Sequence, residues 1–524
     1  MSSMVMKMTR RDAIRKATLG SLGVMAMAQS GPVMAANKQR TNSGPNGKLT
    51  LLQLNDSHGY VDLHLEWFAG PHGAVYRNAG GYARIATLAK QIRAEANGQV
   101  VFLDNGDTFH GTYPIVQSRG ESLVPIMNEL GPAAMTVHWD FAYGPQHLQK
   151  LRHGLKYPML AINIYDRHSG EAFLPPYTMQ EVGGLKVAII GIASNIIDKT
   201  MPPHFSGGLR FTDGREELPG LIERVRSGEK ADLVVVLSHL GFPQDMKLLS
   251  EVPDVDVLLS GHTHHRLYEP VRQGKTLVIQ SGCHGSFLGR LDLEVRDGRI
   301  VDHRHELIEV RQEIPPDPKI DSMVKAVLKP YADQLGCVVG EVGTALNRNA
   351  NIESTMDNFL LTAIRKHAGT PLAFCNGWRW GAPVKPGPVT KNDIYNIIPW
   401  EEPICTVDLT GRELVQMLEE NLERTFSANP FHQLGGYVKR CQGLTAYIKI
   451  ENPPGTRIQK LFIGDEEVEP AQVYSAAYLT VQAVPPVFGI NRKMLSENAQ
   501  SAMLALLESK ESIKAELRGT VKIN

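Results

Sequence analysis

Seven aspartate and histidine side chains occur in short motifs whose residue types could bind metal ions. Imidazole nitrogens and carboxylate oxygens suit Mn, Zn and Fe, and no cysteine stands within these motifs. Seven ligands are too many for one cation with an open position, but they suit two cations that share a carboxylate. The sequence therefore predicts a dinuclear metal site built from Asp56, His58, Asp107, His138, His239, His262 and His264.

Asp107 is the predicted shared ligand of the two ions. One ion is expected on Asp107 with Asp56, His58 and His264, and the other on Asp107 with His138, His239 and His262. Two ions that share ligands lower the pKa of a water molecule between them and polarise an oxygen of the substrate. The predicted chemistry is hydrolysis, with metal-activated water and Asp107 as the catalytic elements.

The ligand motifs stand where predicted strands end. From residue 48 onward, short aliphatic and β-branched runs alternate with helical stretches, which predicts an α/β fold. Ligands bind beyond the carboxyl ends of strands in such sheets, so motifs that follow four strands can converge on one place. These four strands are predicted over 49–54, 100–103, 232–237 and 255–260. Further strands are predicted over 158–163, 186–192, 276–280 and 290–295, and helices over 81–96, 122–130 and 146–154.

The length of 524 residues favours two domains, because a single hydrophobic core rarely keeps growing beyond ~250–300 residues. Prolines 315, 316 and 318 mark the predicted boundary, since proline lacks the amide hydrogen that a strand ladder needs. We expect a catalytic domain over 46–312 and a second α/β domain over 339–524. A linker over 313–338, with a helix at 320–334, is expected to join them.

Residues 1–36 have the pattern of an export signal. Arg10 and Arg11 precede a weakly apolar run over 17–28, which is shorter than the roughly 20 residues that span a bilayer. The twin arginines resemble a Tat signal, although the usual Phe-Leu does not follow them, and an ordinary Sec signal is the alternative. We expect cleavage near Ala36 and a soluble periplasmic product without a membrane anchor.

Charge and cysteine content limit the class of partner. The chain has 55 basic and 55 acidic residues, so no net charge draws it to nucleic acid. Its five cysteines are widely spaced without a Cys-x-x-Cys pair, which argues against a zinc knuckle or a disulfide scaffold and leaves room for at most two bridges. Partners are therefore expected to be recognised locally.

The ligand motifs resemble those of the calcineurin-like metallophosphoesterases, and within them the two-domain 5'-nucleotidases. The motifs Asn55-Asp56-Ser57-His58, Gly106-Asp107, Ser238-His239 and Gly261-His262-Thr263-His264 stand in the order of that family. The resemblance implies a four-layer β-sandwich flanked by helices for the first domain. For the second it implies an α/β domain like the C-terminal domain of 5'-nucleotidases.

One motif departs from the nucleotidase pattern. Where nucleotidases carry Gly-Asn-His-Glu, this chain has Val137-His138-Trp139-Asp140, so a tryptophan replaces the histidine that aids phosphoryl transfer. The indole ring of Trp139 cannot protonate a leaving group. The His-Trp pair instead resembles the SoxB-type thiosulfohydrolases, a branch with a dimanganese site. Stretches at 280–290, 354–359, 378–381 and 435–440 also resemble that branch.

This resemblance implies an activity, a metal and a partner. The substrate would be a cysteine S-sulfonate on a sulfur-carrier protein, whose C-terminal cysteine arm enters a cleft between the domains and from which water releases sulfate. Two divalent ions are implied, manganese first, with zinc or iron as alternatives. Arg379 is expected to contact sulfonate oxygens in a bidentate manner, with a salt-bridged structural role as the alternative. Trp378, Trp380 and Tyr437 are expected to line the approach, and core packing is the alternative for at least one of these rings.

Two other functions stay open. One is a periplasmic 5'-nucleotidase or related phosphoesterase, although the stretch at 484–489 stands where nucleotidases have a Gly-Gly-Asp-Gly-Phe-like segment. The other is a metal-binding scaffold without turnover, which Trp139 favours.

Overall fold

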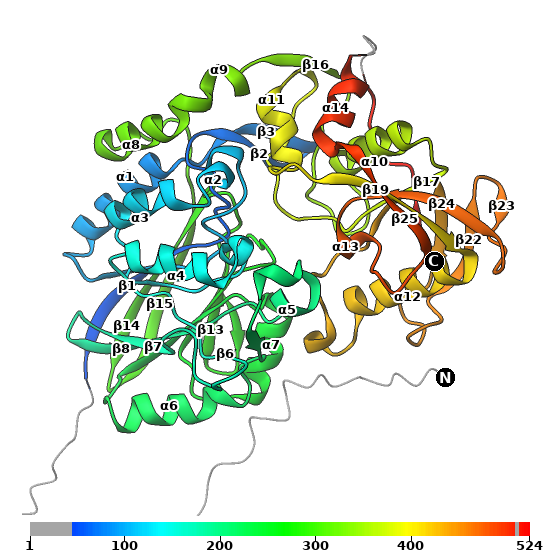
Figure 1. Cartoon of the computed structure of the whole chain (residues 1–524). Coiled ribbons are helices and arrows are strands. Elements are labelled where there is room, and N and C mark those ends of the chain that lie inside the picture. The colour runs from blue at the N-terminus through cyan, green and yellow to red at the C-terminus, as the bar shows by residue number, and fades with distance from the viewer. Residues whose placement is uncertain (1–44, 509–512) are drawn as a thin grey trace, which may run out of the picture. The chain divides into compact units, whose positions relative to one another are not determined.

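Two β-sheets lie face to face in the first domain of the structure, a computed structural model that describes residues 45–508 and 513–524. The first sheet consists of β1 (Gly47–Leu54), β4 (Val100–Asp104), β5 (Ala134–Met135), β14 (Phe287–Arg296) and β15 (Arg299–Glu309). The second consists of β7 (Tyr177–Val182), β8 (Leu185–Ile192), β10 (Leu233–Ser238), β11 (Val257–Ser260), β12 (Val271–Gln273) and β13 (Thr276–Ile279) (Figure 1). Their strand orders are β15-β14-β1-β4-β5 and β12-β13-β11-β10-β8-β7. Side chains of both sheets, among them Leu51, Leu103, Val235 and Leu259, form one buried cluster between them.

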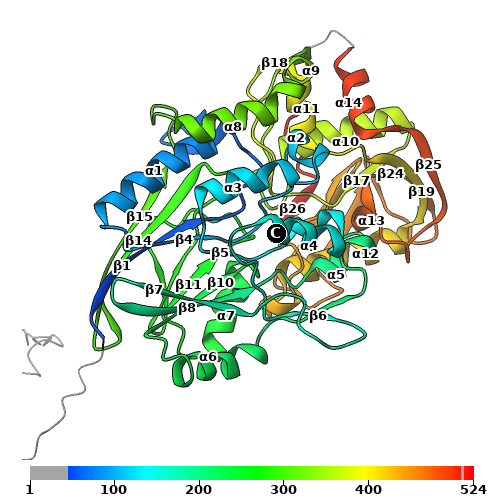
Figure 2. The ribbon, with the colours of Figure 1, turned by 60° about the vertical axis from the view of Figure 1, so that its left-hand side comes forward.

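Helices cover the outer faces of both sheets. The first sheet carries α1 (Tyr82–Glu95), α3 (Val124–Leu130) and α4 (Pro145–Gly154), and the second carries α6 (Glu217–Ser227) and α7 (Phe242–Glu251). Ile85 of α1 shares a buried cluster with Phe102 of the first sheet, and Leu218 of α6 shares another with Val236 of the second. Figure 2 shows α1 and α3 on one side of the paired sheets and α6 on the other. The predicted four-layer fold is confirmed.

The parallel pairing of four strands brings the ligand motifs to neighbouring strand ends. β1 lies parallel to β4 with Leu54 opposite Asp104, and β10 lies parallel to β11 with Ser238 opposite Ser260. Each strand is apolar on both faces because it lies between a helix layer and the other sheet. The polar motifs begin where these buried runs end, so they lie together at the carboxyl ends of the strands in each sheet.

The second domain is built on one mixed sheet between helices. This sheet consists of β17 (Leu372–Cys375), β19 (Pro403–Thr410), β20 (Arg440–Gln442), β24 (Val473–Tyr478) and β25 (Ile490–Asn498). Its strand order is β20-β17-β24-β19-β25. Leu414 and Met417 of α12 (Gly411–Phe426) pack with one face, and α10 (Thr355–Ala368) and α14 (Ala499–Leu507) pack with the other. A smaller sheet contains β21 (Leu444–Ile448), β22 (Ile458–Ile463), β23 (Glu466–Glu467) and β26 (Val521–Ile523). The predicted second α/β domain is confirmed.

The expected linker contains two helices instead of one. Helix α8 (Pro318–Leu328) begins at Asp317, whose carboxylate accepts a hydrogen bond from the backbone N–H of Ile320. A 3-10 turn over Lys329–Tyr331 then separates it from α9 (Ala332–Leu335). Pro330 lies in this turn and lacks the amide hydrogen that would continue α8, which explains the break in the helix predicted over 320–334.

The strand predicted over 158–163 does not form. Leu160 donates its backbone N–H to Met135 of β5, whereas Ile162 donates to Gly191 of β8. Met135 also donates its backbone N–H to Pro158, so the segment makes two hydrogen bonds to β5 and then crosses to the second sheet, where Ile162 bonds to β8. An apolar run buried on both sides looks the same in sequence whether it pairs along one strand or crosses between two sheets.

Two other expectations concern cysteines and the N-terminus. All five cysteines are free thiols in the structure, so none of the one or two disulfide bridges that the sequence would allow is formed. The export signal and its cleavage near Ala36 fall on residues outside the described part of the chain. Within the described residues, no helix combines the length and apolar character that a membrane crossing needs.

A buried ion-pair cluster at the start of α10 supports a stability prediction. Asp357 is fully buried and accepts hydrogen bonds from Nε of Arg348 and Nε of Arg440, each at 2.9 Å. Replacing Asp357 by Asn leaves two buried guanidinium groups without their counter-charge, and should lower the free energy of unfolding by about 3–5 kcal/mol. Urea denaturation of the full chain measures this loss, and the exposed Asp465→Asn variant should stay within about 0.5 kcal/mol of the parent.

The same cluster gives the loss a pH dependence. Burial would raise the pKa of Asp357, but the charges of Arg348 and Arg440 hold it below the usual value. A carboxylate whose pKa is lowered by folding stabilises the protein at neutral pH, and that stabilisation is lost as the pH falls through its folded pKa. The difference between the Asp357→Asn variant and the parent should therefore shrink on acidification; an unchanged difference would contradict this assignment.

Candidate metal centre

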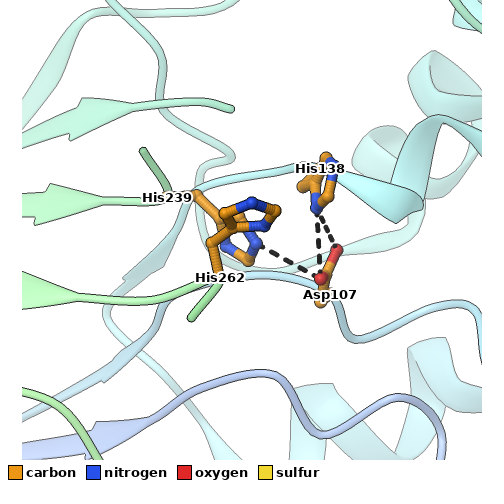
Figure 3. A group of neighbouring side chains, drawn as sticks. All are labelled: Asp107, His138, His239 and His262. Carbon is orange, nitrogen blue, oxygen red and sulfur yellow. Dashed lines mark hydrogen bonds and ion pairs between the residues drawn. The ribbon is translucent and has the colours of Figure 1, made fainter. Parts of the chain in front are cut away.

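Seven predicted ligands come together at the strand ends. The ligand atoms of Asp56, His58, Asp107 and His264 lie within 4.8 Å of one another, and so do those of Asp107, His138, His239 and His262. Figure 3 shows the second group, with His138 and His239 directed at the carboxylate of Asp107. Asp107 belongs to both groups, as the sequence analysis expects of a shared ligand. The structure thus places the residues as predicted, and their role as ligands stays a prediction.

The backbone at this centre is strained. Five of the seven residues have a positive φ: Asp56 (51°), His58 (46°), Asp107 (57°), His262 (70°) and His264 (57°). Side chains with a Cβ atom rarely occupy this left-handed region, and each such residue costs on the order of 1 kcal/mol. Packing of the surrounding sheets and loops must hold these residues in place, which is typical of functional sites.

Several histidine ring nitrogens of the two ligand groups face one another or a carboxylate oxygen at close distance. Nε2 of His58 and Nε2 of His264 face each other at 3.3 Å. His239 places Nδ1 2.6 Å from the carbonyl oxygen of Asn105, which can only accept, so a neutral His239 carries its hydrogen on Nδ1 and presents a lone pair on Nε2. That lone pair lies 3.2 Å from a carboxylate oxygen of Asp107. Two electron-rich atoms at this distance repel each other unless a cation lies between them, so the donor set fits divalent metal ions.

The pKa values point the same way. Burial would raise the pKa of Asp107, but His138, His239 and His58 hold it well below its usual range. Burial would likewise lower the pKa of His239, yet the charges of Asp107 and Asp56 raise it to about 10. A proton on His239 thus supplies some of the positive charge that metal ions would bring.

Asn105 and Asp140 hold this arrangement and were not among the predicted site residues. Asn105 donates through Nδ2 to the carbonyl oxygens of Ser238 (2.9 Å) and Leu259 (2.7 Å), and so ties the end of β4 to the ends of β10 and β11. Asp140 belongs to the Val137-His138-Trp139-Asp140 motif, and Asn105 directly precedes the Gly106-Asp107 motif. Neither was predicted as a site residue, because the prediction considered only metal ligands and substrate contacts.

Asp140 connects the loop of Asp107 to the loop of His138. Its buried carboxylate accepts hydrogen bonds from four backbone N–H groups, two on each oxygen: Thr108 (3.0 Å), Phe109 (2.9 Å), Asp107 (3.1 Å) and His138 (3.1 Å). Burial and the charge of Asp107 raise the pKa of Asp140, whereas these hydrogen bonds oppose the rise. Asp140 therefore positions two predicted ligands relative to each other.

Replacing Asp140 by Asn should weaken metal binding without removing any ligand. The amide turns one acceptor oxygen into a donor, which then faces two backbone N–H groups. Loss of such supporting contacts typically costs about 10–100-fold in metal affinity. Competition with a metal-sensitive dye measures the affinity. Asp140→Glu keeps four acceptor sites and should recover part of it, whereas equal affinities for Asp140→Asn and the parent would contradict a positioning role.

A small cavity of about 40 Å³ lies over the two ligand groups. Its wall includes Trp139, Trp380, Arg379 and Tyr437. Arg379 donates through Nε to the carbonyl oxygen of His262 (3.2 Å), and its Cζ lies 5.2 Å from the ring centroid of Tyr437. Burial lowers the pKa of Arg379, but a guanidinium group stays charged in proteins. The cavity thus offers a buried cation beside the metal centre, which favours an anionic ligand.

Trp378 is not among the residues that line this cavity, in keeping with the core packing that the sequence left open for one of the rings. Its side chain is 1% exposed and packs against Arg348, whose Cζ lies 5.3 Å from the indole centroid. Trp380 lines the cavity instead, and its ring stacks on that of His58 at 5.5 Å. The segment between β17 and β18 (Gly387–Thr390) is irregular, so the sequence offered no periodicity for choosing between the two rings.

Comparison with known proteins assigns both domains. Residues 49–266 match the family model of calcineurin-like phosphoesterases, and residues 336–482 match that of the 5'-nucleotidase C-terminal domain. Calcineurin-like phosphoesterases bind two divalent metal ions. These matches lie on either side of the segment between residues 313 and 318, where the sequence analysis places the end of the catalytic domain.

Several known proteins match most of the chain. The 5'-nucleotidase of Vibrio vulnificus is 25% identical over 443 residues, which cover 74% of this chain and 78% of that protein. Among solved structures, the sulfate thiohydrolase SoxB of Thermus thermophilus has a TM-score of 0.84 at 24% identity, and covers 92% of this chain and 97% of its own. A 5'-nucleotidase precursor from Thermus thermophilus has a TM-score of 0.78 at 23% identity, with 91% and 99% covered. At these identities the structural likenesses show the fold. The chain thus joins a calcineurin-like phosphoesterase domain to a 5'-nucleotidase C-terminal domain, and it is a metal-dependent hydrolase of that architecture.

Proposed function

We propose that this protein hydrolyses a cysteine S-sulfonate and releases sulfate. The observation that carries the proposal is Trp139, which lines the cavity beside the metal centre where a nucleotidase has a histidine. Phosphate esters need help with an alkoxide leaving group, and an indole ring offers no proton for it. The site therefore suits a substrate whose leaving group departs without protonation.

A thiolate is such a leaving group. Water adds its oxygen to the sulfonate sulfur, the bond between that sulfur and the cysteine sulfur breaks, and the electron pair of this bond leaves on the cysteine as thiolate. The products are a free cysteine and sulfate, and no oxidant or reductant is needed. Cysteine has a pKa near 8.5, whereas the pKa of bulk water, a measure of an oxygen leaving group, is about 15.7. The loss of a histidine acid therefore costs little in this reaction.

The cavity residues have separate tasks in this proposal. Arg379 binds sulfonate oxygens and neutralises part of their charge. The rings of Trp139 and Trp380, with centroids 4.7 Å apart, offer an apolar wall against which a divalent sulfur packs favourably. When bound, two divalent ions make water nucleophilic near neutral pH and stabilise the charge that develops on the oxygens. We propose manganese for these ions, with zinc or iron as alternatives.

Two cavities border the ligand groups, one of about 40 Å³ and one of about 420 Å³, and both are lined by His262, His264 and Arg379. The resemblance to the SoxB-type thiosulfohydrolases implies a substrate carried on an extended peptide arm. We therefore propose a carrier protein with a C-terminal cysteine arm as partner and, from the export signal, the periplasm as location.

A 5'-nucleotidase is the second candidate, and the names of the relatives favour it. The curated relatives include several 5'-nucleotidases, and the second domain matches a 5'-nucleotidase model. Hydrolysis of a nucleotide would need an acid other than Trp139. The two family models, both of hydrolase domains, speak against a scaffold without turnover.

One assay on the full-length, manganese-loaded protein separates the candidates. A synthetic peptide ending in Gly-Gly-Cys S-sulfonate and AMP are offered in parallel, and released sulfate and phosphate are measured. Sulfate release with little phosphate release supports the proposal. Brisk AMP hydrolysis without sulfate release overturns it and establishes the second candidate.

A further inference from the structure

A third cluster of metal-binding side chains lies outside the dinuclear centre. It consists of His64 and Glu66 on β2 (His64–Gly70) and of His284, which lies between β13 and β14. Their ligand atoms lie within 4.8 Å of one another, the same limit that unites each group of the dinuclear centre. The side chains are 9%, 4% and 4% exposed. None of the three belongs to the seven residues described above.

The three side chains converge on one point beside Ser286. Nδ1 of His284 lies 3.1 Å from Oε2 of Glu66, and Oγ of Ser286 lies 2.9 Å from the same oxygen. Nε2 of His64 lies 3.0 Å from Oγ of Ser286. The other oxygen of Glu66 accepts hydrogen bonds from Arg266 (3.0 Å) and from the backbone N–H of Trp67 (2.8 Å), which leaves Oε2 free to face the histidines.

Counting hydrogens shows that this cluster lacks one positive charge. Nδ1 of His64 lies 3.0 Å from the carbonyl oxygen of Asp62, which can only accept, so a neutral His64 carries its hydrogen there. Nε2 then has a lone pair, and it needs the single hydroxyl hydrogen of Ser286. The carboxylate oxygen of Glu66 needs the same hydrogen. One contact is therefore left with two electron-rich atoms facing each other, unless an additional cation is present.

The geometry suits a metal ion as this cation, because the three ligand atoms lie within 4.8 Å of one another and the rings of His64 and His284 have centroids 5.8 Å apart. The corresponding distances within the dinuclear centre are 5.2 Å for His58 and His264 and 5.5 Å for His239 and His262.

We propose that Nε2 of His64, Oε2 of Glu66 and Nδ1 of His284 bind a third divalent cation beside the dinuclear centre. Two imidazoles and one carboxylate suit Zn²⁺, Mn²⁺ or Fe²⁺. The hydrogen bond from His64 to Asp62 fixes the ring so that Nε2 is free, which is the usual support for a metal-bound histidine. His284 would bind the ion through Nδ1, so its hydrogen would lie on Nε2. The long hydrogen bond of 3.4 Å that Nε2 accepts from the backbone N–H of Gly381 would then be lost. A cavity of about 70 Å³, lined by Glu66 and His284, provides access for the ion.

The third ion would stiffen the support of the dinuclear centre. The backbone N–H of His284 donates to the carbonyl oxygen of Asp56 at 2.8 Å. Binding at His284 therefore holds the loop that carries Asp56, and it joins this loop to the hairpin of β2 and β3 (Gly73–Ala79). This role does not depend on which substrate the enzyme hydrolyses.

Metal stoichiometry of the full-length protein tests the proposal. Chelator-treated protein is equilibrated with excess Zn²⁺ or Mn²⁺, freed of unbound ions, and analysed by elemental mass spectrometry. We expect three ions per chain for the parent, two for His64→Gln and at most one for Asp107→Asn. The exposed His168→Gln variant is the control and should keep three. Glu66→Gln is the second test variant should His64→Gln fail to fold, as judged by circular dichroism.

Two results would overturn the third site. One is a parent protein that saturates at two ions; the other is a count of three that neither His64→Gln nor Glu66→Gln reduces. Both results leave the dinuclear centre and the proposed S-sulfonate hydrolysis untouched, because the count is measured without substrate. Conversely, failure of the sulfate-release assay would leave a count of three intact.

Discussion

Replacing Asp107 by Asn is expected to remove both hydrolysis and the metal ions of the dinuclear centre. Asp107 is the one residue common to both ligand groups, and its carboxylate faces His138, His239 and His58. The amide has one acceptor oxygen and no charge, so it can neither bridge two cations nor balance them. Paired ions contribute several kcal/mol to the stabilisation of developing charge, which corresponds to a loss of roughly a thousand-fold or more in kcat.

This expectation is checked by measuring kcat and bound metal on the same preparation. Asp302→Asn, an exposed change on β15, is the matched control and should keep both. Thermal unfolding shows whether the Asp107→Asn chain still folds. A folded Asp107→Asn variant that keeps parental activity would contradict the role of Asp107 as a shared ligand that hydrolysis requires.

Replacing Trp139 by His is expected to create or raise phosphoesterase activity. The ring at position 139 lines the cavity next to His138, and its backbone N–H donates to Asp107 at 2.7 Å, a contact that the substitution preserves. A histidine there can protonate an alkoxide leaving group. General acid catalysis contributes about 100–10,000-fold, and we expect the lower end, on the order of a hundred-fold, because His is smaller than the ring it replaces.

The two substrates should respond differently to this change. Hydrolysis of AMP rises, and its rate gains a dependence on a group that titrates near neutral pH. Release of sulfate from the S-sulfonate peptide changes little, because a thiolate leaves without an acid. Trp139→Phe is the control and should raise neither activity. Equal gains on both substrates, or none on AMP, would show that Trp139 does not separate sulfur from phosphate chemistry.

Much of the metal centre could be predicted because its signals are local. Asp56 and His58 follow one buried strand and His262 and His264 another, and a polar motif directly after an apolar run is visible in any single sequence. The parallel pairing of β1 with β4 and of β10 with β11 then needs only a general rule of α/β sheets to bring the strand ends together. The prediction of the seven residues depends on that rule and on their chemical types.

Residues whose hydrogen-bond partners lie on other loops could not be predicted from the sequence. Asp140 binds backbone groups of Thr108 and Phe109, some thirty positions away in the chain, and no periodicity announces a carboxylate that serves backbone N–H groups. Similarly, Glu66 and His284 come from a hairpin and a distant loop, 218 positions apart. Local sequence reports which groups a segment offers, whereas their partners depend on how the loops fold over one another.

The order of the ligands, the shared role of Asp107 and the tryptophan at position 139 could be read from the sequence, and the resemblance to a known family supplied the four-layer fold. The packing of distant segments was needed to show that Trp380 lines the cavity and that His284 meets His64 and Glu66. The physical reason is that strand ends inherit their positions from hydrogen-bonded register, which recurs in every α/β sheet. Side-chain directions in irregular loops instead follow from packing between segments far apart in the chain, and this packing differs from one protein to another.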